Sequence, residues 1–466
     1  MKLKFLTLAC CIFPLMAYAQ TIGQKLSSAI GTLESDPQFK FSGISILVKD
    51  AKTGKTVFDK NSRMGMVPAS CLKIVTSVAA LELLGKEYTY NTTLSYSGSI
   101  KQGMLQVPLI LTASGDPTFG SWRWNHTNRQ SVFNKILQSL KQSGIKSFPG
   151  IVIDVSGWGT QTIPDGWIWE DIGNYYGAGC GAFNWHENQF DILLKPGKSI
   201  GDKVGIISGN QAGIGSIVSE LTTAPTGSGD QAYAYYSLSN STIYLRGTIP
   251  LGSETFGIKA AAADGIAYFA ESMNAELKKS GYSDKCVYTP CEVDCSSFAT
   301  NDVQTICTFE SPGLDSINYW FLKKSVNLFG EAFVKTIGFE KSKSGTTDSG
   351  ISVIRNFWST KGISMAAMKI LDGSGLSPAN RITAEALVTV LQYAKTRPWY
   401  NSFMHALPEI NGIIMKDGYM EGVRSFAGYA KARDGNEYVF SFIVNNYDGS
   451  PKQAREKMWK ILDILK

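Results

Sequence analysis

A serine and a lysine three residues apart are the first candidates for chemistry in this chain of 466 residues. Ser70 and Lys73 follow Pro68, which suits the first turn of a helix, and apolar residues then recur at helical spacing. Residues three apart share a helix face, so the hydroxyl and the amine can touch. Burial and a nearby cation both lower a lysine pKa. We therefore predict that neutral Lys73 activates Ser70 as a nucleophile.

Other catalytic classes find little support in the sequence. The three histidines are His126, His186 and His405, and none lies in a Gly-x-Ser-x-Gly setting. Neither a His-Glu-x-x-His motif nor a phosphate-binding Gly-Lys-Ser/Thr loop is present. The sequence thus argues against a Ser-His-Asp hydrolase and implies neither a metal nor an organic cofactor.

A lysine base also needs a proton relay to the leaving amine, and Ser325-Val326-Asn327 fits this role between two apolar helical segments. We expect Ser325 to pass the proton. Asn327 is expected to hold Lys73 or the substrate amide. The alternative is an ordinary helix-breaking pair.

The anionic end of a substrate needs a cation, and two lysines compete for that role. Lys416-Asp417-Gly418 lies between an apolar run and strand-like sequence, which places it on a sheet edge where Gly418 lets substrate backbone approach closely. Lys343 leads into a helix and follows Ser325 by few residues. We therefore choose Lys416, and Lys343 is expected to be a loop residue.

The ordered set of Ser70-x-x-Lys73, Ser325-x-Asn327 and Lys416-Asp417-Gly418 resembles the active-site motifs of penicillin-binding proteins and serine β-lactamases. The long β-rich interval between the first two is similar to the D-alanyl-D-alanine carboxypeptidase/endopeptidase family of low-molecular-mass class C penicillin-binding proteins. Supporting phrases are Ser114-Gly115-Asp116-Pro117-Thr118, Lys323-Lys324-Ser325-Val326-Asn327-Leu328-Phe329, Gly345-Thr346-Thr347 and Asp372-Gly373-Ser374-Gly375-Leu376-Ser377.

The resemblance implies an α/β (α+β) fold: a transpeptidase/β-lactamase-like domain, with an antiparallel sheet flanked by helices, interrupted by a large β-rich insertion. It implies a serine hydrolase that cuts D-Ala-D-X bonds in peptidoglycan stem peptides and that β-lactams acylate. Ser70 would attack the penultimate D-Ala carbonyl, with the oxyanion held by the backbone N–H groups of Ser70 and Tyr419. Asp154 lies in a stretch that, in the family, can approach the substrate's amino-acid side chain.

One residue departs from the family pattern. The third motif usually carries Thr or Ser between Lys and Gly, whose hydroxyl donates to the substrate carboxylate, and here the residue is Asp417. An ionised carboxylate cannot donate, and it repels another carboxylate. Asp417 must therefore be protonated, be paired with Lys416 or Arg424, or point away. We expect weak activity on free D-Ala-D-Ala peptides, and an increase in the Asp417→Thr variant.

The elements that position these residues come from the two ends of the chain. Residues 20–36 read as a helix, and residues 42–48 and 56–59 as a hairpin. Residues 92–299 read as a mostly-β insertion with one helix at 130–144. Helices are expected at 315–324, 329–337, 352–360, 366–371, 383–396 and 451–465, and strands at 426–433 and 437–445. We predict a discontinuous DD-peptidase domain of residues 20–91 and 300–466.

The first residues and the composition indicate the compartment. Lys2 and Lys4 precede an apolar run and Ala17-Tyr18-Ala19, which together read as a signal peptide (residues 1–19) cleaved after Ala19 for export to the periplasm. We expect at most peripheral membrane contact, because the run is short of the ~20 residues that span a bilayer. The net charge of +6 is mild and without a basic block, which argues against nucleic acid.

Four of the cysteines cluster near the end of the predicted insertion: Cys286, Cys291, Cys295 and Cys307. Their spacing lacks the paired ligands and nearby histidines of a zinc site. In an oxidising compartment we expect one or two disulfides, whose pairing the sequence does not give. Cys71 is expected to be a small buried hydrophobic residue.

Two other functions remain open from sequence. The same serine could serve a β-lactamase or esterase, although the large insertion and the lack of an evident glutamate-based deacylation motif argue against this. A catalytically weakened peptidoglycan-binding protein is the alternative from another class. The preference between carboxypeptidase and endopeptidase action, the diamino acid specificity and the oligomeric state are not determined by the sequence.

Overall fold

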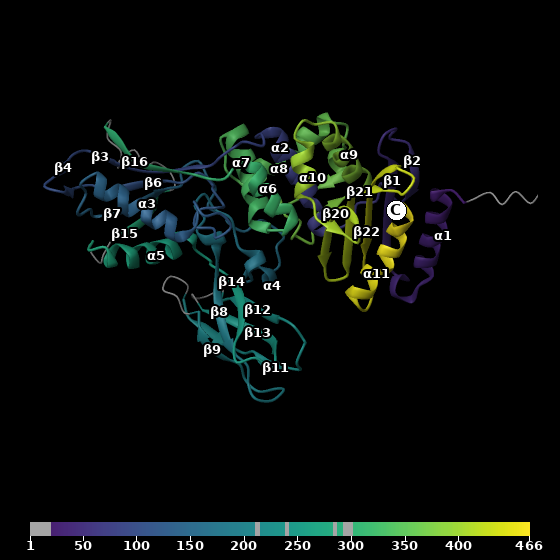
Figure 1. Ribbon diagram of the computed structural model, residues 1–466, viewed down its shortest axis with the longest axis horizontal. Coiled ribbons are helices and arrows are strands. Elements are labelled where there is room, and N and C mark those ends of the chain that lie inside the picture. Colours follow the sequence, from purple (N-terminus) through teal and green to yellow (C-terminus); the bar gives the residue numbers. More distant parts are fainter. Residues whose placement is uncertain (1–19, 210–214, 238–241, 283–286, 292–301) are drawn as a thin grey trace, which may run out of the picture.

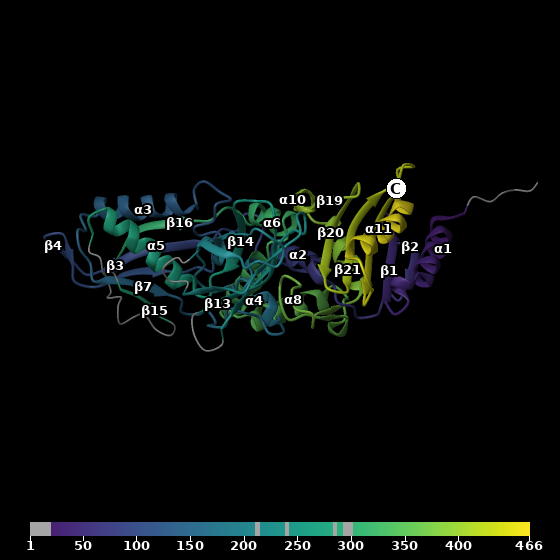
Figure 2. The ribbon, with the colours of Figure 1, turned by 90° about the horizontal axis from the view of Figure 1, so that it is seen from below.

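The computed structural model describes residues 20–209, 215–237, 242–282, 287–291 and 302–466. The predicted signal peptide at residues 1–19, and Cys286 and Cys295, lie outside the described residues. The molecule is elongated, with a six-stranded sheet at one end and a five-stranded sheet at the other (Figure 1). Helices α2, α6 and α8 lie between these two ends (Figure 2).

The six-stranded sheet joins the beginning and the end of the chain. Its strand order is β19-β20-β21-β22-β1-β2, and all neighbours are antiparallel. β1 pairs with β22 over its whole length, from Gly43 opposite Asn445 to Asp50 opposite Tyr438. The strands are β1 (Gly43–Asp50), β2 (Thr56–Lys60), β19 (Glu409–Ile410), β20 (Ile413–Met420), β21 (Val423–Lys431) and β22 (Glu437–Asn445).

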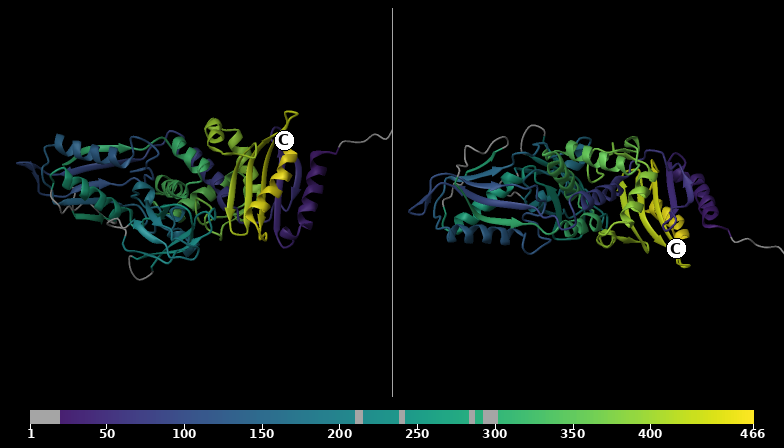
Figure 3. Two further views of the ribbon diagram at one scale, coloured as in Figure 1. Left: turned by 60° about the horizontal axis from the view of Figure 1, so that its bottom comes forward. Right: turned by 90° about the horizontal axis from the view of Figure 1, so that it is seen from above.

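Helices cover both faces of this sheet. On one face, α1 (Ile22–Ser35) and α11 (Pro451–Leu462) pack on alternate residues of β1 such as Ile44, Ile46 and Val48 (Figure 3). The other face packs on a helical layer that includes α2, whose core takes in Leu47 of β1. That layer consists of α2 (Lys73–Leu83), α6 (Leu314–Lys323), α7 (Asn327–Ser342), α8 (Thr347–Thr360), α9 (Ala384–Lys395) and α10 (Tyr400–Ala406).

The five-stranded sheet has the order β15-β7-β6-β3-β16. β6 and β7 are parallel, and α3 forms the crossover between them, as parallel pairing requires. The elements of this lobe are β3 (Asn91–Ser97), β6 (Leu109–Thr112), α3 (Arg129–Gln142), β7 (Gly150–Asp154), α5 (Gly265–Lys279), β15 (Val287–Cys291) and β16 (Val303–Glu310). Because β16 pairs with β3, the pairing favours an insertion that ends near residue 310, one strand beyond the predicted boundary at 299.

Smaller sheets complete the molecule. One has the order β14-β8-β9, and in another β10, β11 and β12 all pair with β13. Their strands are β8 (Gln189–Lys195), β9 (Gly205–Ser208), β10 (Ile217–Ser219), β11 (Thr222–Ala224), β12 (Gln231–Tyr236), β13 (Ile243–Pro250) and β14 (Phe256–Ala261). Two-stranded ribbons pair β4 (Ile100–Lys101) with β5 (Met104–Leu105) and β17 (Met368–Lys369) with β18 (Arg381–Ile382), and α4 is Trp169–Ile172.

Two secondary-structure expectations differ from the structure. The predicted helix at 366–371 is wrong, because Met365–Ala367 makes one 3₁₀ turn and the chain then extends as β17 against β18. A short apolar run fits the period of a helix and that of a strand, so the pairing of β17 with β18 decided which conformation forms. Helix α5 has the apolar spacing of a helix, with Phe269, Met273 and Leu277 buried, and the mostly-β reading of this region overlooked it.

The structure describes four of the cysteines, and its helices can be compared with the length of a membrane span. Cys291 is disulfide-bonded, whereas Cys71, Cys180 and Cys307 are free, so Cys307 does not join the predicted disulfides. Cys71 is fully buried, as expected. In the part of the chain that the structure describes, the helices all fall short of the length and apolarity needed to cross a membrane.

Candidate active site

The Ser70 hydroxyl lies at the junction of two helical segments. Ser70 is in the 3₁₀ turn Ala69–Leu72, which runs directly into α2 at Lys73. Ala69, just before the serine, has a left-handed backbone with φ of 44°, which is uncommon for a residue with a side chain. Backbone of this kind is typical of functional sites, where surrounding contacts hold it in place.

The Lys73 amine has three polar partners. Its Nζ lies 2.9 Å from Ser70 Oγ, 2.6 Å from Asn327 Oδ1 and 2.7 Å from Ser374 O. The amide oxygen and the carbonyl oxygen can only accept hydrogen bonds, so they take two N–H groups. A neutral amine then has its lone pair left for the third partner. In that state Lys73 can accept the proton of the Ser70 hydroxyl.

The orientation of the Asn327 amide is set by a second contact. Its Nδ2 donates to the carbonyl oxygen of Tyr176 at 2.7 Å. Because a carbonyl only accepts, the NH₂ group must face Tyr176, and Oδ1 must face Lys73. Tyr176 belongs to the segment 161–180 that precedes β8, so this part of the chain reaches directly into the site.

The environment of Lys73 favours the neutral amine. Complete burial, followed by the charge of Lys416, lowers the pKa of Lys73 to about 7, although Asp372, Glu331 and Asp417 oppose this shift. A substantial fraction of the amines is therefore neutral near pH 7, where a general base is most effective.

The loop 372–377 supplies the Ser374 carbonyl, and two buried acids hold that loop. Asp372 accepts from Trp167 Nε1 at 2.9 Å and from the backbone N–H groups of Gly375 and Ser377. Glu331, four residues after Asn327 on α7, accepts from the N–H groups of Gly373 and Ser374. Glu331 was not predicted from the sequence, although an acid one turn after Asn327 in an apolar helix indicates a buried polar contact.

Ser325 lies in the link between α6 and α7, two residues before Asn327. Its backbone is left-handed, with φ of 57°, and its side chain is half-buried. Among the described residues, the Lys73 amine bonds Ser70, Asn327 and Ser374 but not Ser325. The relay role of Ser325 stays a prediction.

The predicted anion site holds a carboxylate of its own. Lys416 Nζ donates to Asp417 O at 2.8 Å and to Asp417 Oδ1 at 3.1 Å, and Arg424 Nη1 lies 3.8 Å from Asp417 Oδ2. Burial raises the pKa of Asp417, but Lys416 and Arg424 outweigh burial and hold that pKa below its ordinary value. Of the three alternatives for Asp417, the structure shows the carboxylate paired with Lys416 and Arg424.

Strand β20 passes directly beside the nucleophile. A methyl group on Gly418 would lie 2.6 Å from Pro68 O and 2.9 Å from Ser70 N, so only glycine allows this approach. β19 pairs only with Ile413 and Ile414 of β20. The Lys416–Gly418 stretch therefore lies at a sheet edge, and the exposed Tyr419 side chain follows it.

Asp154 lies in the insertion, and its approach to the substrate stays a prediction. It ends β7, and its Oδ1 accepts from the backbone N–H and the hydroxyl of Ser156 in the following turn. Another acid of the insertion, Asp171, is linked to the site through its hydrogen bond with Tyr176, and burial raises the pKa of Asp171 to about 6. Lys343 ends α7 in a left-handed conformation.

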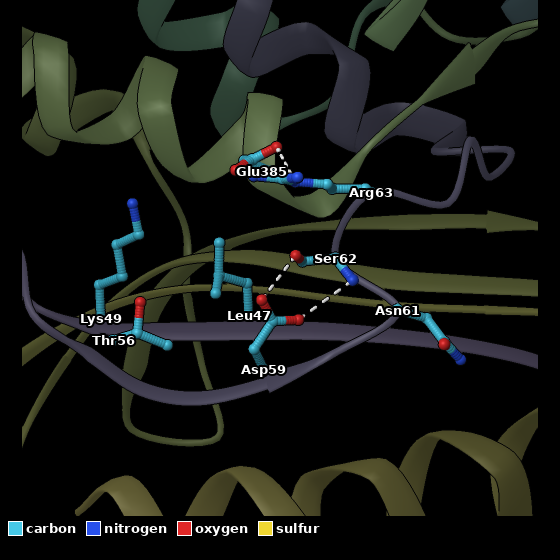
Figure 4. Close-up of a pocket in the computed structure, with 8 residues that line it drawn as sticks. All are labelled: Leu47, Lys49, Thr56, Asp59, Asn61, Ser62, Arg63 and Glu385. Atoms are coloured by element: carbon cyan, nitrogen blue, oxygen red, sulfur yellow. Dashed lines mark hydrogen bonds and ion pairs between the residues drawn. The ribbon is translucent and has the colours of Figure 1, made fainter.

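A polar hollow elsewhere does not contribute. It has a volume of about 490 Å³ and lies between the β1–β2 hairpin and the start of α9 (Figure 4). Two of its charged groups pair with each other, Arg63 with Glu385 at 3.3 Å, and Asp59 accepts from Ser62. No cluster of metal-ligating side chains occurs in the part of the chain that the structure describes.

Comparison with known proteins places this geometry in context. A sequence profile of the D-Ala-D-Ala carboxypeptidase 3 (S13) family matches residues 26–465. The chain is 24% identical to the D-alanyl-D-alanine carboxypeptidase of Actinomadura sp. (strain R39), over 93% of this chain and 84% of the relative. It is 24% identical to the D-alanyl-D-alanine carboxypeptidase DacB of Haemophilus influenzae, over 89% and 88% of the two chains. The crystal structure of penicillin binding protein 4 (dacB) from H. influenzae superposes with a TM-score of 0.78 at 22% identity, covering 94% of this chain and 97% of the other.

Proposed function

The chain belongs to the D-Ala-D-Ala carboxypeptidase 3 (S13) family, and from this membership we propose that it is a serine D-alanyl-D-alanine carboxypeptidase/endopeptidase acting on peptidoglycan stem peptides. The observation that carries the proposal is the Lys73 amine, held by Asn327 Oδ1 and Ser374 O with Ser70 Oγ 2.9 Å away. β-Lactams acylate the same serine in this proposal. A second structure of the H. influenzae protein, with a TM-score of 0.74, is of a β-lactam complex.

In the proposed reaction, Lys73 takes the Ser70 proton as Oγ attacks the carbonyl carbon of the penultimate D-Ala. The backbone N–H groups of Ser70 and Tyr419 hold the oxyanion, and losing one such donor typically costs ~10²–10³ in rate. The C–N bond then breaks, and the proton returns from Lys73 through Ser325 to the leaving amine. In the second half, water attacks the acyl carbon while Lys73 accepts its proton. The C–O bond to Ser70 then breaks, and Lys73 returns the proton to Ser70 Oγ.

The substrate's carboxylate end faces Lys416 and Arg424 in this proposal, with Asp417 as an internal competitor for both cations. The pairing distances to Asp417 support this arrangement. The segment 161–180 of the insertion forms a wall of the site, supported by the bond between Asn327 and Tyr176. Export to the periplasm, with cleavage after Ala19, is part of the same proposal, because peptidoglycan lies outside the cytoplasm.

The decisive experiment uses labelled penicillin and the purified mature protein, with intact mass as the readout. We expect a stable adduct on the wild type and none on Ser70→Ala. The Ser70→Ala variant must unfold at the same temperature as the wild type, so that the loss of the adduct reports the loss of the hydroxyl alone.

The same experiment separates the other two functions. An adduct that forms and disappears within minutes, with hydrolysed penicillin accumulating, indicates a β-lactamase. Absence of an adduct and of D-Ala release from a D-Ala-D-Ala peptide indicates a peptidoglycan-binding protein without catalysis, and overturns the proposal.

A further inference from the structure

Helix α7 presents a row of polar side chains from within a buried surface. Asn327, Glu331 and Lys335 are spaced by four residues, so they lie along one face, and all three are at least nine-tenths buried. Asn327 holds Lys73 and Tyr176, and Lys335 Nζ donates to the carbonyl oxygen of Cys180 at 2.8 Å. Asn327 and Lys335 thus both hold the segment 161–180, and Glu331 between them holds the loop 372–377.

Among the described residues, the hydrogen bonds that Glu331 accepts all come from the loop 372–377. Its Oε1 and Oε2 lie 3.2 and 3.0 Å from Gly373 N, and Oε1 lies 2.9 Å from Ser374 N. The side chain has no exposed surface. Burying a carboxylate is costly, and a group of this kind is retained where its hydrogen bonds fix something specific.

The same loop is held from the opposite side. Thr76, one turn after Lys73 on α2, donates from Oγ1 to Gly373 O at 2.7 Å. The Gly373–Ser374 peptide is therefore clamped at its C=O by α2 and at its N–H by α7. The next carbonyl, Ser374 O, then points at Lys73 Nζ from 2.7 Å.

We propose that Glu331 is a positioning residue for the general base: by holding the Gly373–Ser374 peptide against Thr76, it aims the Ser374 carbonyl at Lys73. This inference rests on the proposed function. Ser374 O and Asn327 Oδ1 occupy two positions around the amine, so Ser374 decides which way the lone pair faces. If the loop moves, the lone pair no longer faces the Ser70 hydroxyl.

Burial and the neighbouring charges shift the pKa of Glu331. Burial, followed by the charge of Asp372, raises the pKa of Glu331, whereas the N–H groups of the loop and Lys73 oppose the shift. Lys335 of α7 also faces the carboxylate. The hydrogen bonds from Gly373 and Ser374 to Glu331 are kept only while the loop stays in place.

The test is Glu331→Gln, measured as Ser70 acylation by penicillin. A glutamine keeps the shape but turns an NH₂ group toward a backbone N–H. We expect the first-order acylation rate constant to fall about 10²-fold, as a misplaced catalytic group does, while the Kd of the non-covalent penicillin complex stays unchanged. A slower acylation step with an unchanged Kd is diagnostic, because Glu331 bonds the loop that orients the base and makes no hydrogen bond to Ser70.

A second pair of variants tests the same clamp without altering charge. Thr76→Val removes the bond to Gly373 O and should slow acylation about tenfold, which corresponds to one lost buried hydrogen bond. Thr76→Ser keeps the hydroxyl and should retain the wild-type rate. If Glu331→Gln does not fold, this pair decides the question.

Glu187→Gln is the matched control. Glu187 is a fully buried carboxylate of the insertion, paired with Arg123 at 2.7 Å and away from Ser70. We expect it to lower the unfolding temperature but to leave the acylation rate constant per folded molecule unchanged. Wild-type rate constants in both Glu331→Gln and Thr76→Val, with only a smaller fraction of active protein, would overturn the positioning role alone. A wild type that penicillin does not acylate overturns the proposed function and this inference together.

Discussion

At the scale of single residues, Asp417 is the side chain that most separates this chain from the family pattern. Its carboxylate lies on Lys416 and within 3.8 Å of Arg424, where a substrate carboxylate would otherwise find both cations free. Two carboxylates ~4 Å apart repel by about 1 kcal/mol in water and about 4 kcal/mol at an effective dielectric of 20. We therefore expect the site to discriminate against a substrate with a free terminal carboxylate.

We expect Asp417→Thr to raise kcat/KM for a D-Ala-D-Ala peptide roughly tenfold, the lower part of the range that this repulsion allows. A hydroxyl would donate to the substrate carboxylate and release Lys416. Release of D-Ala is the measurement. The same peptide with an amidated C-terminus is the control and should gain little. Equal or lower turnover of the free peptide by the variant contradicts the interpretation.

The pH dependence of acylation follows from Lys73. Its pKa is lowered to about 7, chiefly by burial and then by Lys416. Since the neutral amine is the base, acylation by penicillin should lose about tenfold in rate per pH unit below that value and reach a plateau above it.

Lys416→Gln removes one cause of the lowered pKa. The pKa of Lys73 should rise, so the acid limb of the acylation profile should move to higher pH, although penicillin binding also weakens. The limb is read from first-order rate constants at saturating penicillin between pH 5 and 9. A limb that stays in place, or moves to lower pH, would show that Lys416 does not act on Lys73.

Sequence predicted part of the site directly. The three-residue spacing of Ser70 and Lys73 predicted that they touch, and they lie 2.9 Å apart. Asn327 was expected to hold Lys73, and it does, while the catalytic roles stay predictions. The Ser374 contact could not be predicted, because a backbone carbonyl leaves no sequence signal. Asp154 was placed by analogy with a family segment, and its role toward the substrate stays a prediction.

At the scale of elements, the approach of β20 to the 3₁₀ turn at Ser70 depends on one glycine. Gly418→Ala would place a methyl group 2.6 Å from Pro68 O, with Ser70 N and Ser425 also in the way. We expect β20 to shift and acylation to slow about 10²-fold. Gly257→Ala on β14 meets nothing within 4 Å and is the matched control. An unchanged acylation rate in Gly418→Ala would show that β20 moves freely.

The elements themselves were predicted where their pattern was long. The helices at 383–396 and 451–465 and the strands at 426–433 and 437–445 correspond to α9, α11, β21 and β22. The two strands and α9 are buried over most of their length, and α11 buries Ala454, Met458, Ile461 and Leu462 at helical spacing, so the pattern is repeated several times. At 366–371 a single apolar run carried no period, and pairing with β18 decided its conformation.

At the scale of the whole molecule, the insertion and the helical layer share one site. Lys335 of α7 donates to the carbonyl oxygens of Gln161 and Cys180, both in the segment 161–180. Trp167 of that segment donates to Asp372, and Asn327 donates to Tyr176. We predicted the division of the chain into two domains from the order of the sequence alone, and residues on both sides of that division contribute to the site.

We expect Lys335→Met to lower the free energy of unfolding by roughly 2 kcal/mol. Two buried carbonyl groups lose their donor, at about 1–3 kcal/mol each, and the removal of a buried amine offsets part of the loss. Chemical denaturation measures the change. Lys341→Met, at an exposed position in the last turn of the same helix, is the control and should stay near the wild type. A variant as stable as the wild type would show that Lys335 does not tie the insertion to α7.

The four-residue spacing along α7 also determines where the protein tolerates a change in chain length. One extra residue between Asn327 and Glu331 would rotate the rest of the helix by about 100°. Glu331 and Lys335 would then leave their loops while Asn327 kept its place. Loops at the surface absorb added residues at small entropic cost. Among proteins built like this one, insertions and deletions should therefore collect in the strand connections of the β-rich lobe and spare the first three turns of α7.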